Sequence, residues 1–482
     1  MTHTHDELHI PLLRAGEPYR SLQTAPLTDV RTGETLGTVS QAIPGLIARD
    51  LDRAPENRAA LDEYEVSELI EICHRASKLF AEAELPLYPG AEMTQTPEDY
   101  LDQLAATAGM PQAMGRANMA KVTDVMGRVE DVIDGLTRGL DLSVLDGGWG
   151  SQSGRRLSYQ RLTETMGAIL PNNSPGVHNL WLPTFPLKVK LVLRPGGAEP
   201  WTPYRMVTAL IEAGAPPQAF SLYPSGHNAV SELLLKTGRS MFFGDAATVE
   251  AWRGTGKVQL HGPGWSKVIF DTAAAEGWSE HVEMLASSVA MNGGRSCINC
   301  SGVWTPAHGR EIADAMAQRL AGIDGLPLDH PEAGLAAFPK PQVARAISDM
   351  IDQQLEIPGA EDLTARYREG GRVAEAGGCT FLRPTVIHVS DREHPLAAAE
   401  FVFPFVTVVD CPEEDVLEAI GPTLIGSVIA DSDVFRQRAL ECHHIDRLNL
   451  GAIPTYKISW DQPHEGNLFD HLYQQRSFQM AS

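Results

Sequence analysis

Hydrophobic residues in the first third of the chain recur at the spacing of amphipathic helices. The segment 63–85 places apolar side chains three and four residues apart, which puts them on one helix face: Val66, Leu69, Ile70, Cys73, Leu79 and Phe80. The run Thr96–Asp99 is typical of a helix N-terminus, with Pro97 at the first helical position and acids in the first turn. A second periodic segment covers residues 118–136. The pattern predicts a helical region over residues 43–145.

From Met166 onward, short apolar runs alternate with helical segments. The predicted strands are 167–170, 189–195, 220–223, 240–243 and 258–260, and the predicted helices between them are 203–213, 229–235 and 246–252. After Cys297 the alternation resumes with a helix at 307–320, strands at 385–389 and 401–409, and a helix at 413–420. Strands and helices that take turns predict an α/β fold with a parallel sheet covered by helices on both faces.

The composition of the chain argues against several classes of function. The 482 residues carry a net charge of -23, which argues against a nucleic-acid binder and against docking on anionic membranes. No apolar run reaches the length of a membrane span, and the N-terminus lacks the basic and apolar regions of a signal peptide. These features favour a cytoplasmic enzyme with a small-molecule substrate.

Cys297 lies in a sequence that could present a nucleophile. Two glycines, Arg295 and Ser296 precede the thiol directly, and residues typical of a strand follow at 303–304. Glycine allows close approach of backbone to a substrate. A small buried apolar role for the cysteine is the alternative. Cys297 and Cys300 also form a CxxC, which is typical of a redox dithiol or of half a zinc site. No second CxxC and no histidine at zinc-finger spacing accompany it, so we expect no metal site.

Six short motifs follow one another at the ends of predicted strands and helices. They are Pro171–Pro175, Leu191–Pro195, Phe243–Asp245, His261–Gly264, Gly294–Cys297 and Glu400–Pro404. In this order and approximate spacing the chain resembles the aldehyde dehydrogenase superfamily over residues 165–455. The resemblance implies a Rossmann-type cofactor domain, an α/β catalytic domain and a small β oligomerisation element.

The catalytic roles carry over motif by motif. Cys297 resembles the family's catalytic thiol, with Arg295 where the family has glutamine. Asn173 resembles the asparagine whose amide, with the backbone N–H of the cysteine, stabilises the oxyanion of the hemithioacetal. The alternative for Asn173 is a turn residue beside proline. The expected reaction is attack of the thiolate on an aldehyde, hydride transfer to a nicotinamide, and cleavage of the thioester left on the cysteine by water or by a thiol.

The resemblance also implies cofactor contacts for NAD or NADP. Glu400 corresponds to the glutamate that binds the nicotinamide ribose, and Gly244 and Asp245 correspond to the helix start that faces the pyrophosphate. Asp245 is a poorer neighbour for phosphate than the family's serine. Arg194 replaces the cofactor-side lysine and can still hydrogen-bond ribose or phosphate. Glu199 is a candidate to disfavour a 2′-phosphate by charge repulsion.

His261 stands where hydrolytic members carry the glutamate that activates water. The stretch 260–266, LHGPGWS, resembles the acylating branch, which lacks that glutamate and exchanges acyl groups with coenzyme A. The first interpretation is therefore an enzyme that interconverts an aldehyde and an acyl thioester, with coenzyme A as co-substrate. The alternatives are hydrolysis, with His261 or a glutamate from elsewhere as base, and an inactive member with a binding role.

The resemblance divides the chain as follows. Residues 1–149 and 164–262 form the cofactor domain, including the helical region, and residues 263–447 form the catalytic domain. Residues 150–163 and 448–482 form an oligomerisation hairpin and tail, which implies homodimers or homotetramers. The tail after 446 carries aromatic residues and histidines without helical period.

Overall fold

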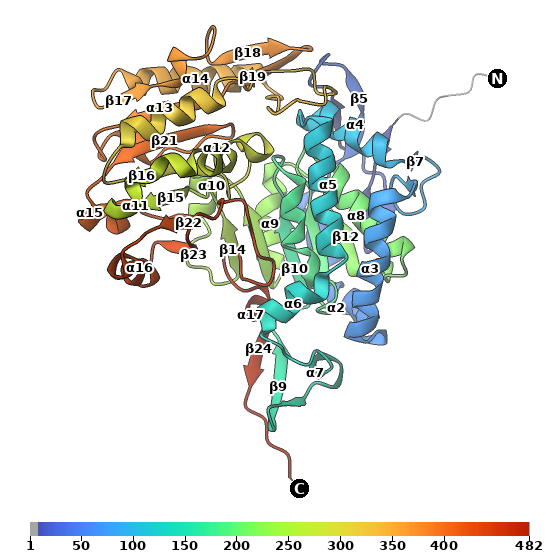
Figure 1. Cartoon of the computed structure of the whole chain (residues 1–482). Helices are drawn as coiled ribbons and strands as arrows, with labels where there is room; N and C mark the ends of the chain where they lie inside the picture. The colour runs from blue at the N-terminus through green and yellow to red at the C-terminus, as the bar shows by residue number, and fades with distance from the viewer. Residues whose placement is uncertain (1–7, 482) are drawn as a thin grey trace, which may run out of the picture.

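A computed structural model describes residues 8–481 and contains two seven-stranded sheets (Figure 1). Four parallel pairs join five strands of the first sheet, and two N-terminal strands extend it at one edge in antiparallel fashion. Its order is β14 (Val258–His261), β13 (Arg239–Phe243), β10 (Thr165–Ile169), β11 (Lys190–Arg194), β12 (Phe220–Leu222), β2 (Leu12–Arg14) and β3 (Glu17–Tyr19). The parallel α/β arrangement predicted for this region is confirmed.

The second sheet is parallel except for one edge strand, β17. Its order is β17 (Ala360–Asp362), β20 (Thr385–Val389), β21 (Phe405–Asp410), β16 (Cys300–Thr305), β15 (Ser266–Phe270), β22 (Thr423–Ile429) and β23 (Ile445–Leu450). Its accompanying helices are α12 (Val282–Ala290), α13 (Gly309–Leu320), α14 (Pro341–Leu355), α15 (Glu413–Ala419) and α16 (Asp433–Leu440). Both sheets contribute to the cavity described below. The first sheet lines it with the carboxyl ends of β13 and β14, and the second with the start of β16.

The predicted helical region forms and packs against the first sheet (Figure 1). Its main helices are α1 (Pro44–Leu51), α3 (Val66–Glu82), α4 (Pro97–Ala108), α5 (Gln112–Met126) and α6 (Val129–Thr137), and the sheet's own helices include α8 (Trp201–Glu212), α9 (Val230–Lys236) and α10 (Ala246–Glu250). The start of α4 is as predicted: Thr96 before Pro97 and Asp99 two residues after it form a reciprocal capping box.

A small third sheet projects from the body of the molecule (Figure 1). It consists of β8 (Gly150–Gln152), β9 (Arg155–Arg161) and the C-terminal strand β24 (Tyr473–Arg476), which pairs antiparallel with β9 after the short helix α17 (Leu468–Leu472). The oligomerisation role of residues 150–163 and 448–482 stays a prediction, as do the domain boundaries at 149, 262 and 447. None of the helices in residues 8–481 is long and apolar enough to cross a membrane.

Two details differ from the sequence expectation. The strand expected at 401–409 begins only at Phe405, because residues 401–404 form a loop against the nucleophile turn, where a Cβ on Gly294 would lie 2.3 Å from the Pro404 nitrogen. Residues 341–355, for which the sequence pattern predicts no helix, form α14 with Pro341 as its first residue.

Candidate active site

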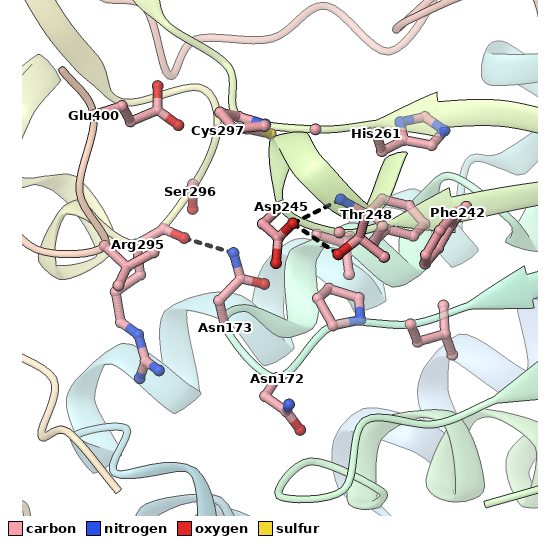
Figure 2. A pocket seen from close by; sticks show the side chains of 18 of the residues that line it. Asn172, Asn173, Phe242, Asp245, Thr248, His261, Arg295, Ser296, Cys297 and Glu400 are labelled. Carbon is pink, nitrogen blue, oxygen red and sulfur yellow. Dashed lines mark hydrogen bonds between the residues drawn. The ribbon is translucent and has the colours of Figure 1, made fainter. Parts of the chain in front are cut away.

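A cavity of about 760 Å³ lies where the two sheets meet, a size typical of cofactor and substrate sites. Seven of the eight residues expected from the sequence line it: Asn173, Arg194, Gly244, Asp245, His261, Cys297 and Glu400. They lie at or just after the carboxyl ends of β10, β11, β13 and β14, or in the turns after α12 and before β21. Figure 2 shows Asn173, Asp245, His261, Cys297 and Glu400 of this set. Ligands of open α/β sheets bind outside these strand ends.

The eighth residue, Glu199, does not line this cavity. Its side chain is 2% exposed, accepts hydrogen bonds from Thr202 N–H (2.8 Å) and hydroxyl (2.7 Å), and pairs with His178 at 3.0 Å. The expectation that Glu199 repels a 2′-phosphate is therefore wrong for this structure. Its carboxylate is hydrogen-bonded to the first turn of α8, where an acid satisfies backbone N–H groups that have no partner within the helix.

The turn that carries Cys297 depends on glycine. Asn292, Gly293 and Gly294 all have positive φ (53°, 63° and 68°), and the thiol follows in a turn before β16. Opposite, a Cβ on Gly264 would lie 1.7 Å from the Cys297 carbonyl oxygen. Because no side chain fits there, the chain at Gly264 can run directly against the backbone of Cys297 and fix its position.

The Cys297 thiol is only partly exposed, and its environment opposes ionisation. Burial raises the pKa of the thiol well above its ordinary value, the charges of Glu465 and Glu400 raise this pKa further, and Lys121 acts in the opposite direction. A thiol in this setting is protonated at neutral pH. Attack on a carbonyl therefore requires a neighbouring group to take the thiol proton.

Asn173 is held beside the nucleophile turn (Figure 2). Its Nδ2 donates a hydrogen bond to the Arg295 carbonyl at 2.7 Å. An amide nitrogen carries two hydrogens, so the second remains for an oxygen in the cavity. Arg295 in turn donates from Nη1 to Ala108 O (3.1 Å) at the end of α4, and burial lowers the pKa of its guanidinium to about 10. The arginine that replaces the family's glutamine thus ties the turn to the helical region.

A network that the sequence did not reveal fixes the same turn. Asn118 of α5 donates to Asn292 Oδ1 at 2.7 Å and accepts from Ser174 at 3.1 Å, while Asn292 donates to the hydroxyls of Ser174 (3.2 Å) and Ser296 (3.0 Å). Asn118 lies 174 residues before Asn292. Only its polarity on the otherwise buried face of a predicted helix could have indicated a role.

Arg194 and Asp245 define the part of the cavity expected to hold the cofactor. Arg194 donates from Nη2 to Ser225 O at 2.7 Å, and its Nε is buried with no partner among residues 8–481, so it suits a ribose hydroxyl or phosphate. Asp245 caps α10 by accepting from Thr248 N–H (2.8 Å) and hydroxyl (2.7 Å) (Figure 2). The residues fit a nicotinamide dinucleotide at the arginine, while Asp245 places a negative charge where a phosphate would approach.

Glu400 is bound to the backbone opposite Cys297. Its carboxylate accepts hydrogen bonds from Gly264 N–H (2.9 Å) and Trp265 N–H. Burial nevertheless raises the pKa of Glu400 to about 7, against the effect of these two bonds and of Lys267. Its role as a ribose ligand stays a prediction, and its raised pKa also makes it a candidate acid or base.

The raised pKa of Glu400 predicts a pH-dependent loss of stability. The folded state holds the proton more tightly than the unfolded chain, so the contribution of Glu400 is most favourable below pH 4.5 and is lost as pH rises to about 7. We expect the unfolding free energy of the wild type, minus that of Glu400→Gln, to fall by about 3 kcal/mol between pH 4.5 and 7.5 in urea titrations. A pH-independent difference would contradict this assignment.

His261 is paired with a glutamate from the C-terminal segment. Its ring stacks on Phe243, with centroids 4.4 Å apart, and Nδ1 is hydrogen-bonded to the carboxylate of Glu465. Nε2 of His261 is buried without a hydrogen-bond partner in the described part of the chain. Sequence reasoning missed Glu465, because 204 residues separate the two side chains.

The chain resembles known proteins in fold and in its sequence profile. No curated protein sequence matches the chain. Solved structures share its fold: 3,6-anhydro-L-galactose dehydrogenase in complex with NAP (14% identity, 98% of this chain and 99% of that one, TM-score 0.76), an aldehyde dehydrogenase from Bacillus cereus in an NAD+ complex (16%, 97% and 96%, 0.76), and a glyceraldehyde-3-phosphate dehydrogenase from Methanocaldococcus jannaschii complexed with NADP (12%, 95% and 99%, 0.74). The sequence profile of the aldehyde dehydrogenase family matches residues 21–422, and the chain therefore belongs to this family.

Proposed function

We propose that the protein oxidises an aldehyde with NAD or NADP through a thioester on Cys297. The observation that carries the proposal is the meeting of Cys297, Asn173 and Glu400 in one cavity formed by segments far apart in the chain. Family membership and the cofactor complexes of structures with the same fold support it.

Each of the cavity residues has a separate role in the proposed reaction. The Cys297 thiol gives its proton to a neighbouring base, for which Glu400 is the candidate, and its sulfur attacks the aldehyde carbon. The free Nδ2 hydrogen of Asn173 stabilises the oxygen that becomes negative. The cofactor, when bound, accepts the hydride from that carbon. Arg194 and Glu400 are the proposed contacts to its ribose and phosphate groups. Partial burial limits water around the reacting atoms.

The acyl acceptor is the second part of the proposal. The sequence around His261 favours a thiol such as coenzyme A, whereas a base beside the thioester would favour water. Steady-state assays with short aliphatic aldehydes and NAD or NADP, with and without coenzyme A, distinguish the two. Formation of NAD(P)H supports the oxidoreductase. A chain that neither binds the cofactor in calorimetry nor forms NAD(P)H would instead be an inactive member of the family.

Replacing Asp245 is expected to strengthen cofactor binding. Asp245→Ser retains an N-cap for α10 but removes a carboxylate from the cavity wall near the expected phosphates. We expect the Kd for NAD or NADP to fall about fivefold, equivalent to about 1 kcal/mol. Calorimetric titration measures the change. Glu250→Gln, on the same helix but outside the cavity lining, should leave the Kd unchanged, and an equal effect of both variants would contradict a local contact.

A further inference from the structure

Lys121 is a partly buried cation that has no acid to pair with. Its ammonium makes no hydrogen bond and no ion pair anywhere in the residues that the structure describes. The buried lysines of the same region of the chain are all bonded: Lys188 pairs with Asp146, and Lys190 and Lys267 donate to backbone carbonyls. The chain has 62 acidic residues against 39 basic ones, so a shortage of acids does not explain the missing partner. A desolvated charge without a partner costs free energy, and a charged ligand removes that cost.

Lys121 is fixed beside the nucleophile. It lies on α5 one turn after Asn118, which is hydrogen-bonded to the turn that precedes Cys297. A Cβ on Gly176 would lie 3.6 Å from Lys121 Nζ, and the next residue, Val177, lines the cavity together with Cys297. The ammonium therefore adjoins the cavity wall on the side of the thiol.

The charge of Lys121 acts on the thiol without a direct bond. Lys121 lowers the pKa of Cys297, and Cys297 raises the pKa of Lys121, although no hydrogen bond joins the two side chains. Burial lowers the pKa of Lys121, and no carboxylate among the described side chains opposes this effect. A short substrate held at the sulfur can span the separation between the two groups.

Apolar side chains of the C-terminal segment surround the thiol and the ammonium. The ring centroid of Trp460 lies 5.4 Å from Lys121 Nζ, and Tyr456 and Ile458 pack in one cluster with Cys297. Each of these five side chains keeps part of its surface exposed, so a ligand can reach them. Apolar walls with a single cation suit a short carbon chain with one negative charge.

Trp460 is held in place by its neighbours along the segment. A Cβ on Gly135 would lie 2.2 Å from Asp461 O, so the segment passes directly over α6. Arg447 of β23 donates to Ser459 O at 3.1 Å on the other side of the tryptophan. A wall that is formed before the ligand arrives loses little freedom on binding.

We propose that Lys121 binds the substrate, and that the substrate is a short aldehyde with a carboxylate at its opposite end. This inference rests on the proposed function, because it names the substrate class of that site. With the aldehyde carbon at the Cys297 sulfur, the carboxylate pairs with the Lys121 ammonium and the chain between them lies against Trp460. One ammonium neutralises one negative charge, whereas a phosphate carries up to two and is bound by several donors. The site therefore favours a carboxylate over a phosphate.

Two substrates that differ in charge test the assignment. 4-Oxobutanoate and its methyl ester have nearly the same shape, but only the first carries a carboxylate. With the wild type and NAD or NADP, kcat/KM should be about 20-fold higher for the acid than for the ester. In Lys121→Met this ratio should fall to about one, chiefly through a higher KM for the acid. An effect of the lysine on the Cys297 thiol changes both substrates equally and cancels in the ratio.

Charge reversal and a control on the same helix sharpen the test. Lys121→Glu should prefer 4-trimethylammoniobutanal to 4-oxobutanoate, the reverse of the order in the wild type. Arg116→Met removes another cation of α5, which pairs with Glu98 at 3.5 Å outside the cavity lining. The ratio between acid and ester should be unchanged in this variant.

Binding of an unreactive analogue separates the inference from the proposed function. 4-Hydroxybutanoate carries the same carboxylate but no aldehyde, and its Kd in calorimetric titrations should rise about tenfold in Lys121→Met. Three results overturn the inference: equal kcat/KM for acid and ester in the wild type, an unchanged ratio in Lys121→Met, or a higher kcat/KM for glyceraldehyde 3-phosphate than for 4-oxobutanoate. The first and third need no variant. Absence of NAD(P)H with every aldehyde would instead refute the proposed function, while a Kd that depends on Lys121 would still support the carboxylate site.

Discussion

Cys297→Ser is expected to abolish the burst of NAD(P)H and to lower kcat by about four orders of magnitude or more. A serine hydroxyl is a far weaker nucleophile than a thiolate, and its proton is much harder to remove than that of a thiol. The raised pKa of the wild-type thiol shows that even the sulfur requires assistance in this environment. Stopped-flow absorbance at 340 nm with saturating cofactor and aldehyde measures the effect.

Cys300 provides the control for this substitution. It lies three residues away, is buried, and donates from Sγ to Gly302 O at 3.3 Å within β16. Cys300→Ser preserves a small donor and should retain the burst. Cofactor affinity should be unchanged in Cys297→Ser, since the expected contacts are Arg194 and Glu400. A retained burst in Cys297→Ser would require another nucleophile.

Asn173→Ala is expected to lower kcat about 100- to 1000-fold with a small change in KM. The amide is held by the Arg295 carbonyl at 2.7 Å, so its second hydrogen is directed before the substrate arrives and costs no reorganisation. The charge on the aldehyde oxygen develops only as sulfur bonds to carbon, and a lost donor therefore raises the barrier more than it weakens binding. Steady-state kinetics with NAD or NADP gives the kcat and KM values.

Two further variants test the donor assignment. Asn173→Asp keeps the shape but replaces the donor by a carboxylate that repels both the Arg295 carbonyl and the oxyanion, so its loss should be at least as large. Asn172→Ala removes the adjacent amide, whose Oδ1 accepts from Ala198 N–H at 2.8 Å, and should change kcat only severalfold. A larger loss in Asn172→Ala than in Asn173→Ala would contradict the oxyanion role.

The elements of the fold could be predicted because their signals are local. The apolar period of α3, the capping sequence before Pro97 and the alternation after Met166 are all present in short segments. Where the expectation was wrong, a distant contact decided the conformation. Residues 401–404 have the hydrophobicity of a strand but form a loop that meets Gly294, more than a hundred residues earlier.

The sequence by itself determined the family resemblance and the candidate nucleophile, since Cys297, Asn173 and Glu400 occur in motifs that can be recognised one at a time. Only the tertiary structure decided which charges meet. It buried Glu199 in a helix cap and brought Glu465 to His261 from across 204 residues. Hydrogen bonds and charge interactions act over a few ångströms in space, and separation along the chain contains no information about that distance.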